Sequence, residues 1–328
     1  MLHFDTDYMA GAHPKVMERL LKTNHLQTVG YGSDDYTKHA AELIKDACGK
    51  PDARVYFLTG GTQTNATVID GLLAKHQGVL AAESGHINVH EAGAIEASGH
   101  KILTLPQHEG KIWASELKEY IENFYNDDTY EHMVAPGMLY ISFPTEYGTV
   151  YSYEELKEIS DICNKYQMPL YIDGARLAYG LAAENGNVTL NDIAALADVF
   201  YIGGTKVGAL FGEAVVITNP GILKNFTPLV KQHGALLAKG RLLGLQFEAL
   251  FADGLYFEIG KETVRKAMDL RNAFEENGFN AAMDSPTNQQ FFVLPNTVID
   301  SLKKNVSFEM WGPRGVSEST VRFVTGWS

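Results

Sequence analysis

Cysteine, positive charge and long apolar runs are all scarce in this chain of 328 residues. The two cysteines, Cys48 and Cys163, lie too far apart for the ligand spacing of a zinc site. We therefore expect no bound metal and interpret both as small buried hydrophobic residues. No stretch reaches the ~18 consecutive apolar residues of a membrane span, and residues 1–5 lack a signal-peptide pattern. These absences predict a cytoplasmic protein with no membrane contact.

The charge balance is acidic, because 40 Asp and Glu outnumber 27 Lys and Arg for a formal net charge of −13. Binding to a nucleic-acid backbone needs clustered basic residues, so we expect no nucleic-acid partner. A length of 328 residues is typical of about two domains. Such a chain buries roughly three quarters of its unfolded surface and needs no disulfide to fold. The composition therefore favours a two-domain protein that acts on a small molecule.

Short apolar runs alternate with amphipathic stretches over most of the chain. Strands followed by helices of this length predict crossover connections and an α/β fold with a mainly parallel sheet. The runs expected to form buried strands are 54–58, 78–82, 101–105, 138–142, 169–172, 199–202 and 213–217. Helices are expected over residues 62–75, 87–98, 114–125 and 153–166.

The spacing of the pattern lengthens after Pro220. Long helices are expected over 234–252 and 257–276, followed by short strands over 289–294, 306–310 and 320–325. This order predicts a second, smaller α+β domain packed on the first. We place the boundary near residue 245, so that residues 1–245 form the large domain and 246–328 the small one. The first 15 or so residues are expected to pack beside the small domain.

A glycine-rich turn, Gly60 to Asn65, follows the strand that ends at Leu58 and opens a helix. Free N–H groups and the helix dipole make such a turn an anion site. The turn lacks the Lys-Ser/Thr pair of a nucleotide-binding P-loop and the third glycine of the dinucleotide motif. The competing interpretation is a tight turn in which Thr62 caps the helix.

Asp173 and Arg176 follow the strand 169–172, where functional groups gather in parallel α/β sheets. The arginine could bind a carboxylate through two hydrogen bonds, or it could pair with Asp173 and brace the turn. Lys206 follows the strand 199–202 among several glycines, which let a bulky ligand approach the backbone closely. An exposed loop lysine is the alternative.

Pyridoxal 5'-phosphate needs three features that this chain offers at successive strand ends: an anion site, then an aspartate, then a lysine. Its phosphate needs a helix N-terminus, its ring nitrogen an aspartate, and its aldehyde a lysine that burial makes nucleophilic. Asp173 and Lys206 are 33 residues apart, which leaves room for a crossover helix and the next strand. A nucleotide-binding module would not explain the lysine.

The chain resembles the threonine aldolase and β-eliminating lyase family of fold-type I pyridoxal-phosphate enzymes over nearly its whole length. It looks closest to the low-specificity L-threonine aldolases, including the phenylserine aldolase-like branch. The resemblance implies a mainly parallel central sheet with helices on both faces, a small α+β C-terminal domain, and a homodimer or homotetramer with shared active sites. Its landmarks are residues 4–14, 31–37, 84–91, 145–150, 173–176, 203–213 and 321–325.

The resemblance also implies roles for single residues. For the cofactor, Lys206 would bind the aldehyde, Asp173 would pair with the ring nitrogen, and His86 would stack on the ring. Gly61 and Thr62 would hold the phosphate. The residues implied to bind the substrate's carboxylate are Thr6, Arg176, which also contacts the cofactor, and Arg322, an unpaired charge in an apolar strand. Two residues, Tyr31 and Lys231, would reach the site from a neighbouring subunit, Lys231 toward the phosphate.

The implied reaction is the cleavage of L-threonine, L-allo-threonine or related β-hydroxy-α-amino acids to glycine and an aldehyde. The base that removes the β-hydroxyl proton stays open between Glu146, His86 and a water, because Thr145-Glu146 stands where much of the family has a histidine after the threonine. Alternatives within the same cofactor class are β-elimination, racemisation and transamination. A cofactor-binding protein without turnover is the alternative from another class.

Overall fold

Among residues 1–184 and 186–328, which the computed structural model describes, the largest sheet has seven strands in the order β2-β8-β7-β6-β5-β3-β4. Only β8 runs against its two neighbours in this sheet, which confirms the mainly parallel sheet expected from the sequence. The strands are β2 (Arg54–Leu58), β3 (Gln77–Ala82), β4 (Ile102–Leu105), β5 (Ala135–Ser142), β6 (Leu170–Asp173), β7 (Val199–Gly203) and β8 (Glu213–Ile217).

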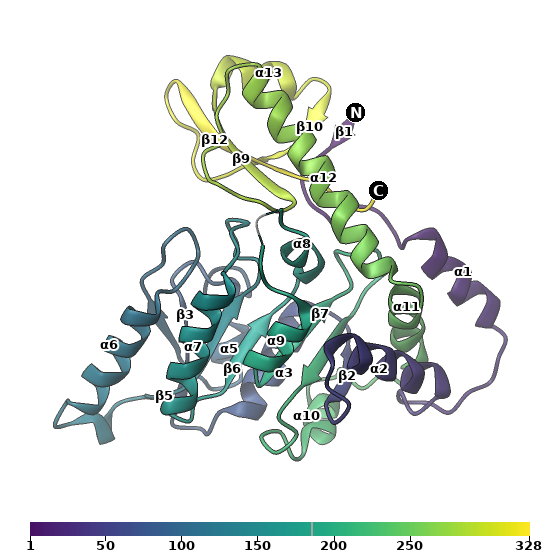
Figure 1. Ribbon diagram of the computed structural model, residues 1–328, viewed down its shortest axis with the longest axis vertical. Helices are drawn as coiled ribbons and strands as arrows, with labels where there is room; N and C mark the ends of the chain where they lie inside the picture. The colour runs from purple at the N-terminus through teal and green to yellow at the C-terminus, as the bar shows by residue number, and fades with distance from the viewer. Residues whose placement is uncertain (185) are drawn as a thin grey trace.

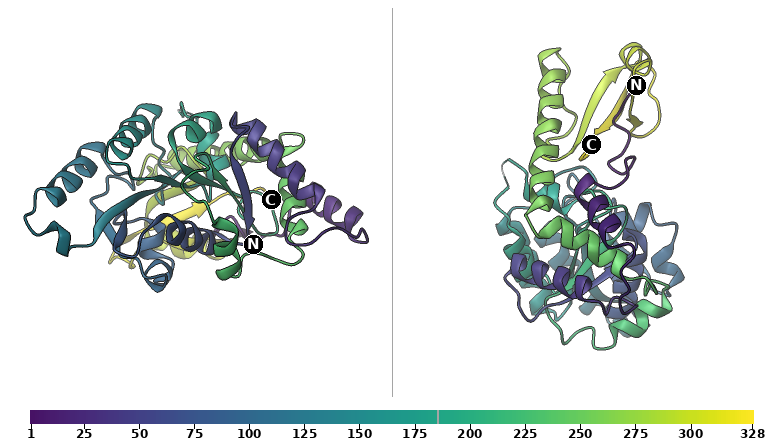
Figure 2. Two further views of the ribbon diagram at one scale, coloured as in Figure 1. Left: turned by 90° about the horizontal axis from the view of Figure 1, so that it is seen from below. Right: turned by 90° about the vertical axis from the view of Figure 1, so that its right-hand side faces the viewer.

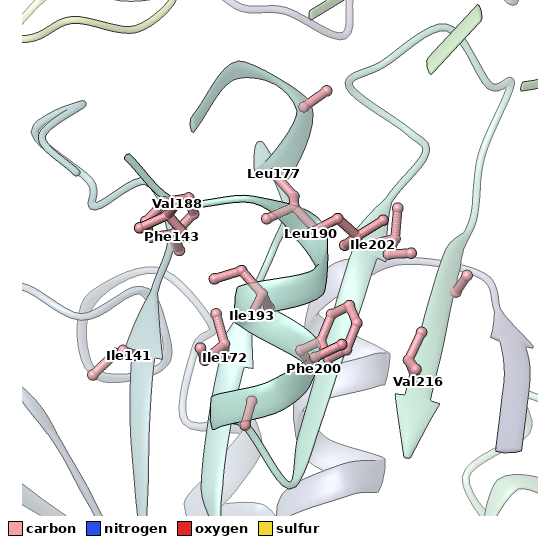
Figure 3. Close-up of a cluster of buried hydrophobic side chains, with 14 of the residues drawn as sticks. Ile141, Phe143, Ile172, Leu177, Val188, Leu190, Ile193, Phe200, Ile202 and Val216 are labelled. Atoms are coloured by element: carbon pink, nitrogen blue, oxygen red, sulfur yellow. The ribbon is translucent and has the colours of Figure 1, made fainter. Parts of the chain in front are cut away.

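Helices cover both faces of this sheet, because alternate side chains of each strand point to opposite faces and both sets are apolar. Phe200 and Ile202 point into one core together with Ile193 of α9, as Figure 3 shows. Tyr201, between them, belongs to the opposite core. The first core includes α1 (Pro14–Thr23), α2 (Asp35–Cys48), α6 (Ala114–Tyr125), α7 (Tyr153–Lys165), α8 (Leu177–Leu181), α9 (Leu190–Leu196) and α11 (Arg241–Phe251). The opposite core includes α3 (Gly61–Leu72), α4 (His86–Val89), α5 (Ala94–Ala97) and α10 (Phe226–Gln232).

A small antiparallel sheet, in the order β11-β12-β9, stands at one end of the molecule. The long helix α12 runs from the body of the protein up beside this sheet (Figures 1 and 2). Phe292 and Phe323 of the sheet pack with Phe274 of α12 in a separate apolar core. These elements are α12 (Leu255–Glu276), β9 (Gln289–Pro295), α13 (Asn296–Leu302), β11 (Glu309–Met310) and β12 (Glu318–Val324).

The N-terminal segment lies beside the small sheet. Strand β1 (Leu2–His3) pairs in parallel with β10 (Val306–Ser307), and the backbone N–H of Val324 donates to the carbonyl of Phe4. Leu245, where we predict the domain boundary, lies within α11. The boundary itself stays a prediction.

Three elements expected from the sequence differ in the structure. The helix over 87–98 is two short helices, α4 and α5, because Ala92 and Gly93 take left-handed backbone angles between them. The helix over 234–252 begins only at Arg241, and Gly234, with a left-handed φ of 72°, lies outside it. The strand over 306–310 is divided into β10 and β11, which pair with different strands. A 3-10 turn, Tyr130–His132, precedes β5.

None of the helices in the described residues is long and apolar enough to cross a membrane.

Candidate active site

A cavity of about 590 Å³ opens where the carboxyl ends of β5, β6 and β7 meet the small sheet. This edge of a parallel sheet collects the loops that follow its strands, so side chains distant in sequence converge there. The cavity is lined by eight of the residues to which the resemblance assigns a role: Gly61, Thr62, His86, Glu146, Asp173, Arg176, Lys206 and Arg322. Thr6, Tyr31 and Lys231 do not line it.

The turn after β2 leaves backbone donors free at one end of the cavity. Helix α3 begins at Gly61, its N-cap is Gly60, and no side chain accepts a hydrogen bond from the first turn. The interpretation of Thr62 as the helix cap is therefore wrong. Because the first N–H groups of a helix need an acceptor and carry a partial positive charge, this turn fits a phosphate group.

Asp173, the last residue of β6, is buried and ionised. Its Oδ2 accepts hydrogen bonds from the hydroxyl of Tyr140 (2.7 Å) and the side-chain amide of Asn65 (3.0 Å), and its Oδ1 accepts from the backbone of Ala175 (3.0 Å). Burial raises the pKa of Asp173, but nearby His86 and these hydrogen bonds hold it below its ordinary value. The carboxylate is therefore suited to keep a proton on a ring nitrogen.

His86 is held by a second buried carboxylate. Its Nδ1 lies 2.8 Å from Oε1 of Glu91, and the same oxygen accepts from Asn65 at 2.7 Å. Burial lowers the pKa of His86, but Glu91 and Asp173 outweigh that effect and raise it. Asn65 thus links the two carboxylates, one beside His86 and the other at the end of β6.

Lys206 lies in the cavity without an ion-pair partner among the described residues. Burial and the charge of Arg176 lower the pKa of its amine, although Asp7 and Asp173 oppose this shift. A lysine in such surroundings loses its proton readily and becomes a nucleophile.

The glycines near Lys206 serve a different purpose from the one expected. A Cβ on Gly203 would lie 2.3 Å from the carbonyl oxygen of Ala175, and one on Gly204 would lie 2.7 Å from that of Gly212. These glycines therefore let protein backbones approach one another, not a ligand.

Arg176 is paired with Asp7 and not with Asp173. Its Nε lies 2.7 Å from Oδ2 of Asp7 and its Nη2 lies 3.0 Å from Oδ1, a two-point ion pair that is almost fully buried. Thr6 precedes Asp7 in the chain, but it does not line the cavity. Only Nη1 of the guanidinium has no hydrogen-bond partner in the described part of the chain.

Arg322 is also paired, which corrects the expectation of an unpaired charge. Its Nη2 donates to Glu309, directly opposite on the neighbouring strand β11, and its Nη1 donates to Oε1 of Gln289 at 2.9 Å. The guanidinium lies over the ring of Trp311, 4.9 Å from the centroid. Glu309 is far more exposed than the arginine, with 44% of its side chain accessible against 12%.

Glu146 presents a partly buried carboxyl group at the cavity wall. Its Oε1 accepts from the backbone N–H of His86 at 2.8 Å and from the hydroxyl of Ser142 at 2.6 Å. Within the described chain, its other oxygen has no partner. Burial raises the pKa of Glu146. A carboxylate with one free oxygen and a raised pKa is a suitable general base.

Tyr31 and Lys231 lie together, away from the cavity. The Nζ of Lys231 is 4.8 Å from the ring centroid of Tyr31, and half of that tyrosine is exposed. Tyr31 lines a separate cavity of about 240 Å³. Within one chain these residues therefore do not join the site.

Several site residues were given no role from the sequence. Asn65, Glu91 and Glu213 all lie inside motifs that were noticed, but a carboxylate or amide in a motif does not reveal which group it contacts. Asp7 directly follows Thr6, and its partner comes from 169 residues further along the chain. Glu309 and Trp311 come from the small sheet, whose strands were located without any functional residue besides Arg322.

The donor set fits pyridoxal 5'-phosphate. Asp173 is ionised, and no cationic group among the described residues lies within ion-pair distance of it. The pKa of Lys206 is lowered. The first turn of α3, whose backbone N–H groups are free, lines the same cavity. These three features correspond to the ring nitrogen, the aldehyde and the phosphate of that cofactor. The fold and the site therefore define the class of pyridoxal-phosphate enzymes built on an α/β sheet.

The chain belongs to the beta-eliminating lyase family, which residues 3–294 match. It is 31% identical over 255 residues to the low specificity L-threonine aldolase of a Pseudomonas species, an alignment that covers 77% of this chain and 72% of the relative. The low specificity L-threonine aldolase of Pseudomonas aeruginosa is 26% identical, in an alignment that covers 99% of this chain and 92% of that relative.

Solved structures agree with this placement. A threonine aldolase of Leishmania major is 41% identical, with a TM-score of 0.97 over 100% of this chain and 95% of that one. Cystalysin of Treponema denticola, a structure that contains pyridoxal 5'-phosphate, is 16% identical with a TM-score of 0.71, over 99% of this chain and 86% of that one. The second likeness concerns the fold alone.

Proposed function

We propose that this enzyme cleaves L-threonine, L-allo-threonine or related β-hydroxy-α-amino acids into glycine and an aldehyde, with pyridoxal 5'-phosphate as cofactor. The observation that carries the proposal is one cavity that combines Lys206 and Asp173 with two arginines and the carboxyl group of Glu146. The first two residues fit the cofactor, the arginines fit an amino acid's carboxylate, and the glutamate fits its β-hydroxyl group. The relatives named as threonine aldolases support the same reaction.

When bound, the cofactor supplies a ring that accepts the electron pair of the bond that breaks. Lys206 would hold its aldehyde carbon, and the turn at Gly61 and Thr62 its phosphate. Asp173 is ionised and would keep the ring nitrogen protonated, which would strengthen the ring as an electron acceptor. His86, fixed by Glu91, would cover the ring.

Arg176 and Arg322 would hold the substrate's carboxylate. Both guanidinium groups line the cavity; burial lowers the pKa of Arg322, and the charge of Arg176 lowers it further. A carboxylate between them relieves this repulsion, and hydrogen bonds to both arginines fix the orientation of the amino acid. Orientation decides which bond to the α-carbon breaks, so this grip selects cleavage between the α- and β-carbons.

Among the open choices for the base, we propose Glu146. Its free oxygen would take the proton of the β-hydroxyl group, while the oxygen bonded to Ser142 and the His86 backbone holds the carboxyl in place. His86 is less suited, because its Nδ1 is already engaged by Glu91 and its raised pKa favours the charged form.

A product assay tests the proposal. Purified protein loaded with pyridoxal 5'-phosphate should convert L-threonine to equal amounts of glycine and acetaldehyde, and Lys206→Ala should abolish this. Lys261→Ala, which changes an exposed lysine of α12, is the matched control and should keep the wild-type rate. Formation of ammonia and 2-oxobutanoate would instead identify an elimination, and loaded protein that yields none of these products would contradict the proposal. Side-by-side rates with L-allo-threonine and phenylserine rank the substrates.

We further propose a dimer or tetramer in which a second chain brings Tyr31 and Lys231 to the cavity. Leu26 and Val29, two exposed apolar residues of the loop that contains Tyr31, support a subunit contact at this loop. Sedimentation velocity should show no monomer, and a fully active monomer would contradict the assembly. The cytoplasm is the proposed compartment, supported by the two free thiols of Cys48 and Cys163.

A further inference from the structure

Gln289, the first residue of β9, is fully buried where the small sheet meets the cavity. In this sheet β12 lies between β11 and β9, and Arg322 of β12 stands directly opposite Glu309 of β11. On the other side Gln289 stands opposite Val324, two residues further along β12. Because alternate residues of a strand point to the same face, Glu309, Arg322 and Gln289 share one face. The guanidinium group is therefore held from both neighbouring strands.

The two partners of Arg322 differ in charge and in freedom to move. Its Nη1 donates to the neutral carbonyl oxygen of Gln289 at 2.9 Å, whereas its Nη2 donates to the carboxylate of Glu309. Gln289 is 0% exposed, but 44% of the Glu309 side chain is accessible. The buried amide has no solvent to move into, while the carboxylate does. Arg322 thus has one fixed, uncharged partner and one charged partner that a ligand can replace.

The amide nitrogen of Gln289 contributes no hydrogen bond. Its Nε2 is buried without a partner in the described part of the chain, and its Oε1 bonds to Arg322. Gln290 beside it has a different role, because its Nε2 donates to the carbonyls of Ser285 (3.0 Å) and Thr287 (2.8 Å) and fixes the preceding loop. A buried donor without an acceptor is destabilising, so stability alone would favour an apolar residue in place of Gln289. What this residue adds is the carbonyl group that faces the arginine.

We propose that Gln289 is a positioning residue for Arg322: its carbonyl group fixes the guanidinium, and its lack of charge leaves the arginine's positive charge to the substrate. This inference rests on the proposed binding of the substrate's carboxylate by Arg322. An incoming carboxylate replaces Glu309 alone, while Nη1 stays bonded to Gln289. A carboxylate at position 289 would instead neutralise Arg322 from a buried place that it cannot leave, and would exclude the substrate's own carboxylate.

The first test exchanges the two partners of the arginine. A double variant, Gln289→Glu with Glu309→Gln, keeps one carboxylate and one amide beside Arg322 but moves the carboxylate to the buried side. The readout is the carboxylate-specific affinity, defined as the dissociation constant of glycinamide divided by that of glycine. Calorimetric titration of the cofactor-loaded protein measures both constants. We expect this ratio to fall by about tenfold or more, because a buried opposite charge binds the guanidinium strongly. An unchanged or higher ratio would overturn the proposal.

The single variant Gln289→Met avoids placing a charge in the small sheet. Methionine keeps the length of the side chain but lacks the carbonyl group, so Glu309 alone would hold the guanidinium. We expect the carboxylate-specific affinity to fall about three- to tenfold, while the affinity for glycinamide changes by less than about twofold. Gln167→Met, at an exposed position between α7 and β6, is the matched control and should keep the wild-type ratio. Equal losses for glycine and glycinamide would show general damage to the site and would reject a positioning role.

A third variant, Arg322→Met, separates this proposal from the assignment on which it rests. It should lower the carboxylate-specific affinity by about tenfold or more if this arginine binds the carboxylate. With that loss observed, an unchanged ratio in Gln289→Met rejects only the role of Gln289. Without that loss, Arg322 does not bind the carboxylate, and both ideas are overturned. These measurements record binding and need no turnover, so they stay decisive even if the enzyme does not cleave L-threonine.

Discussion

Asp7 and Arg176 form a buried two-point ion pair that joins the N-terminal segment to the turn after β6, with N–O distances of 2.7 and 3.0 Å. Asn288, just before β9, donates to the same carboxylate at 2.9 Å. Burial raises the pKa of Asp7, but Arg176 and Lys206 lower it more strongly, so the group stays ionised. The pair therefore neutralises one of the two arginines proposed to bind the substrate before any substrate arrives.

Asp7→Asn should leave Arg176 buried and uncompensated. We expect the free energy of unfolding at pH 7 to fall by about 3–5 kcal/mol, the usual cost of breaking a buried pair. Because the folded pKa of Asp7 is lowered, its stabilisation is present above the ordinary aspartate pKa of about 3.9 and is lost as pH falls through the folded pKa. Urea unfolding should show this, and Asp52→Asn, an exposed control, should change stability by less than about 0.5 kcal/mol. Equal stability of the two variants would contradict the role of the pair.

Glu146→Gln should remove the proposed base while keeping the shape of the side chain. We expect kcat to fall by about 10²–10⁴-fold, with a smaller change in KM. In the wild type, kcat should fall as pH drops through the pKa of Glu146, which burial raises, because only the ionised carboxylate accepts a proton. The variant should lack this acidic limb in its pH–rate profile. Glu83→Gln, at an exposed position, serves as the control, and an acidic limb that survives in Glu146→Gln would identify another base.

The central sheet was predictable because its strands are short apolar runs bounded by polar turns, and those away from the edges are buried on both faces. The helices α1 and α2 were not located, although their apolar faces pack into the main core. The break between α4 and α5 depends on the left-handed backbone of Ala92, a non-glycine residue for which sequence gives little warning.

Asp173 and Lys206 could be predicted as site residues because the residue type and its place at a strand end were enough to single them out. The site was not predictable where two segments meet: Asp7 lies 169 positions from Arg176 in the chain, and Glu309 reaches Arg322 only through the register of β11 and β12. Pairings of this kind depend on tertiary packing, and no local pattern encodes them.

Glu91→Gln should weaken the hold on His86. Glu91 raises the pKa of His86 through its hydrogen bond and its charge, so a neutral amide should lower that pKa. The NMR titration of the His86 ring would measure the shift, with His108, which pairs with Glu116 elsewhere, as an internal reference that should not move. An unchanged His86 titration would show that Glu91 does not set the charge of this ring.

Glu309→Gln should strengthen substrate binding. Glu309 accepts a hydrogen bond from Arg322. If Arg322 binds the substrate's carboxylate, as we propose, that carboxylate must displace Glu309 from the guanidinium. The accessible side chain of Glu309 can move away into solvent, whereas Asp7, fully buried beside Arg176, cannot. Removing the competing charge should therefore lower KM by about three- to tenfold with little change in kcat, as expected for a residue that opposes binding alone.

Steady-state kinetics with L-threonine would measure the effect of Glu309→Gln, and Glu318→Gln, at an exposed position of β12, is the matched control. The control should keep the wild-type KM. A raised KM in Glu309→Gln would mean that the carboxylate holds Arg322 in its binding position instead of competing for it. Ionic strength gives a second readout: because salt screens the exposed Glu309 more than the buried Arg322, added salt should lower the wild-type KM relative to that of the variant.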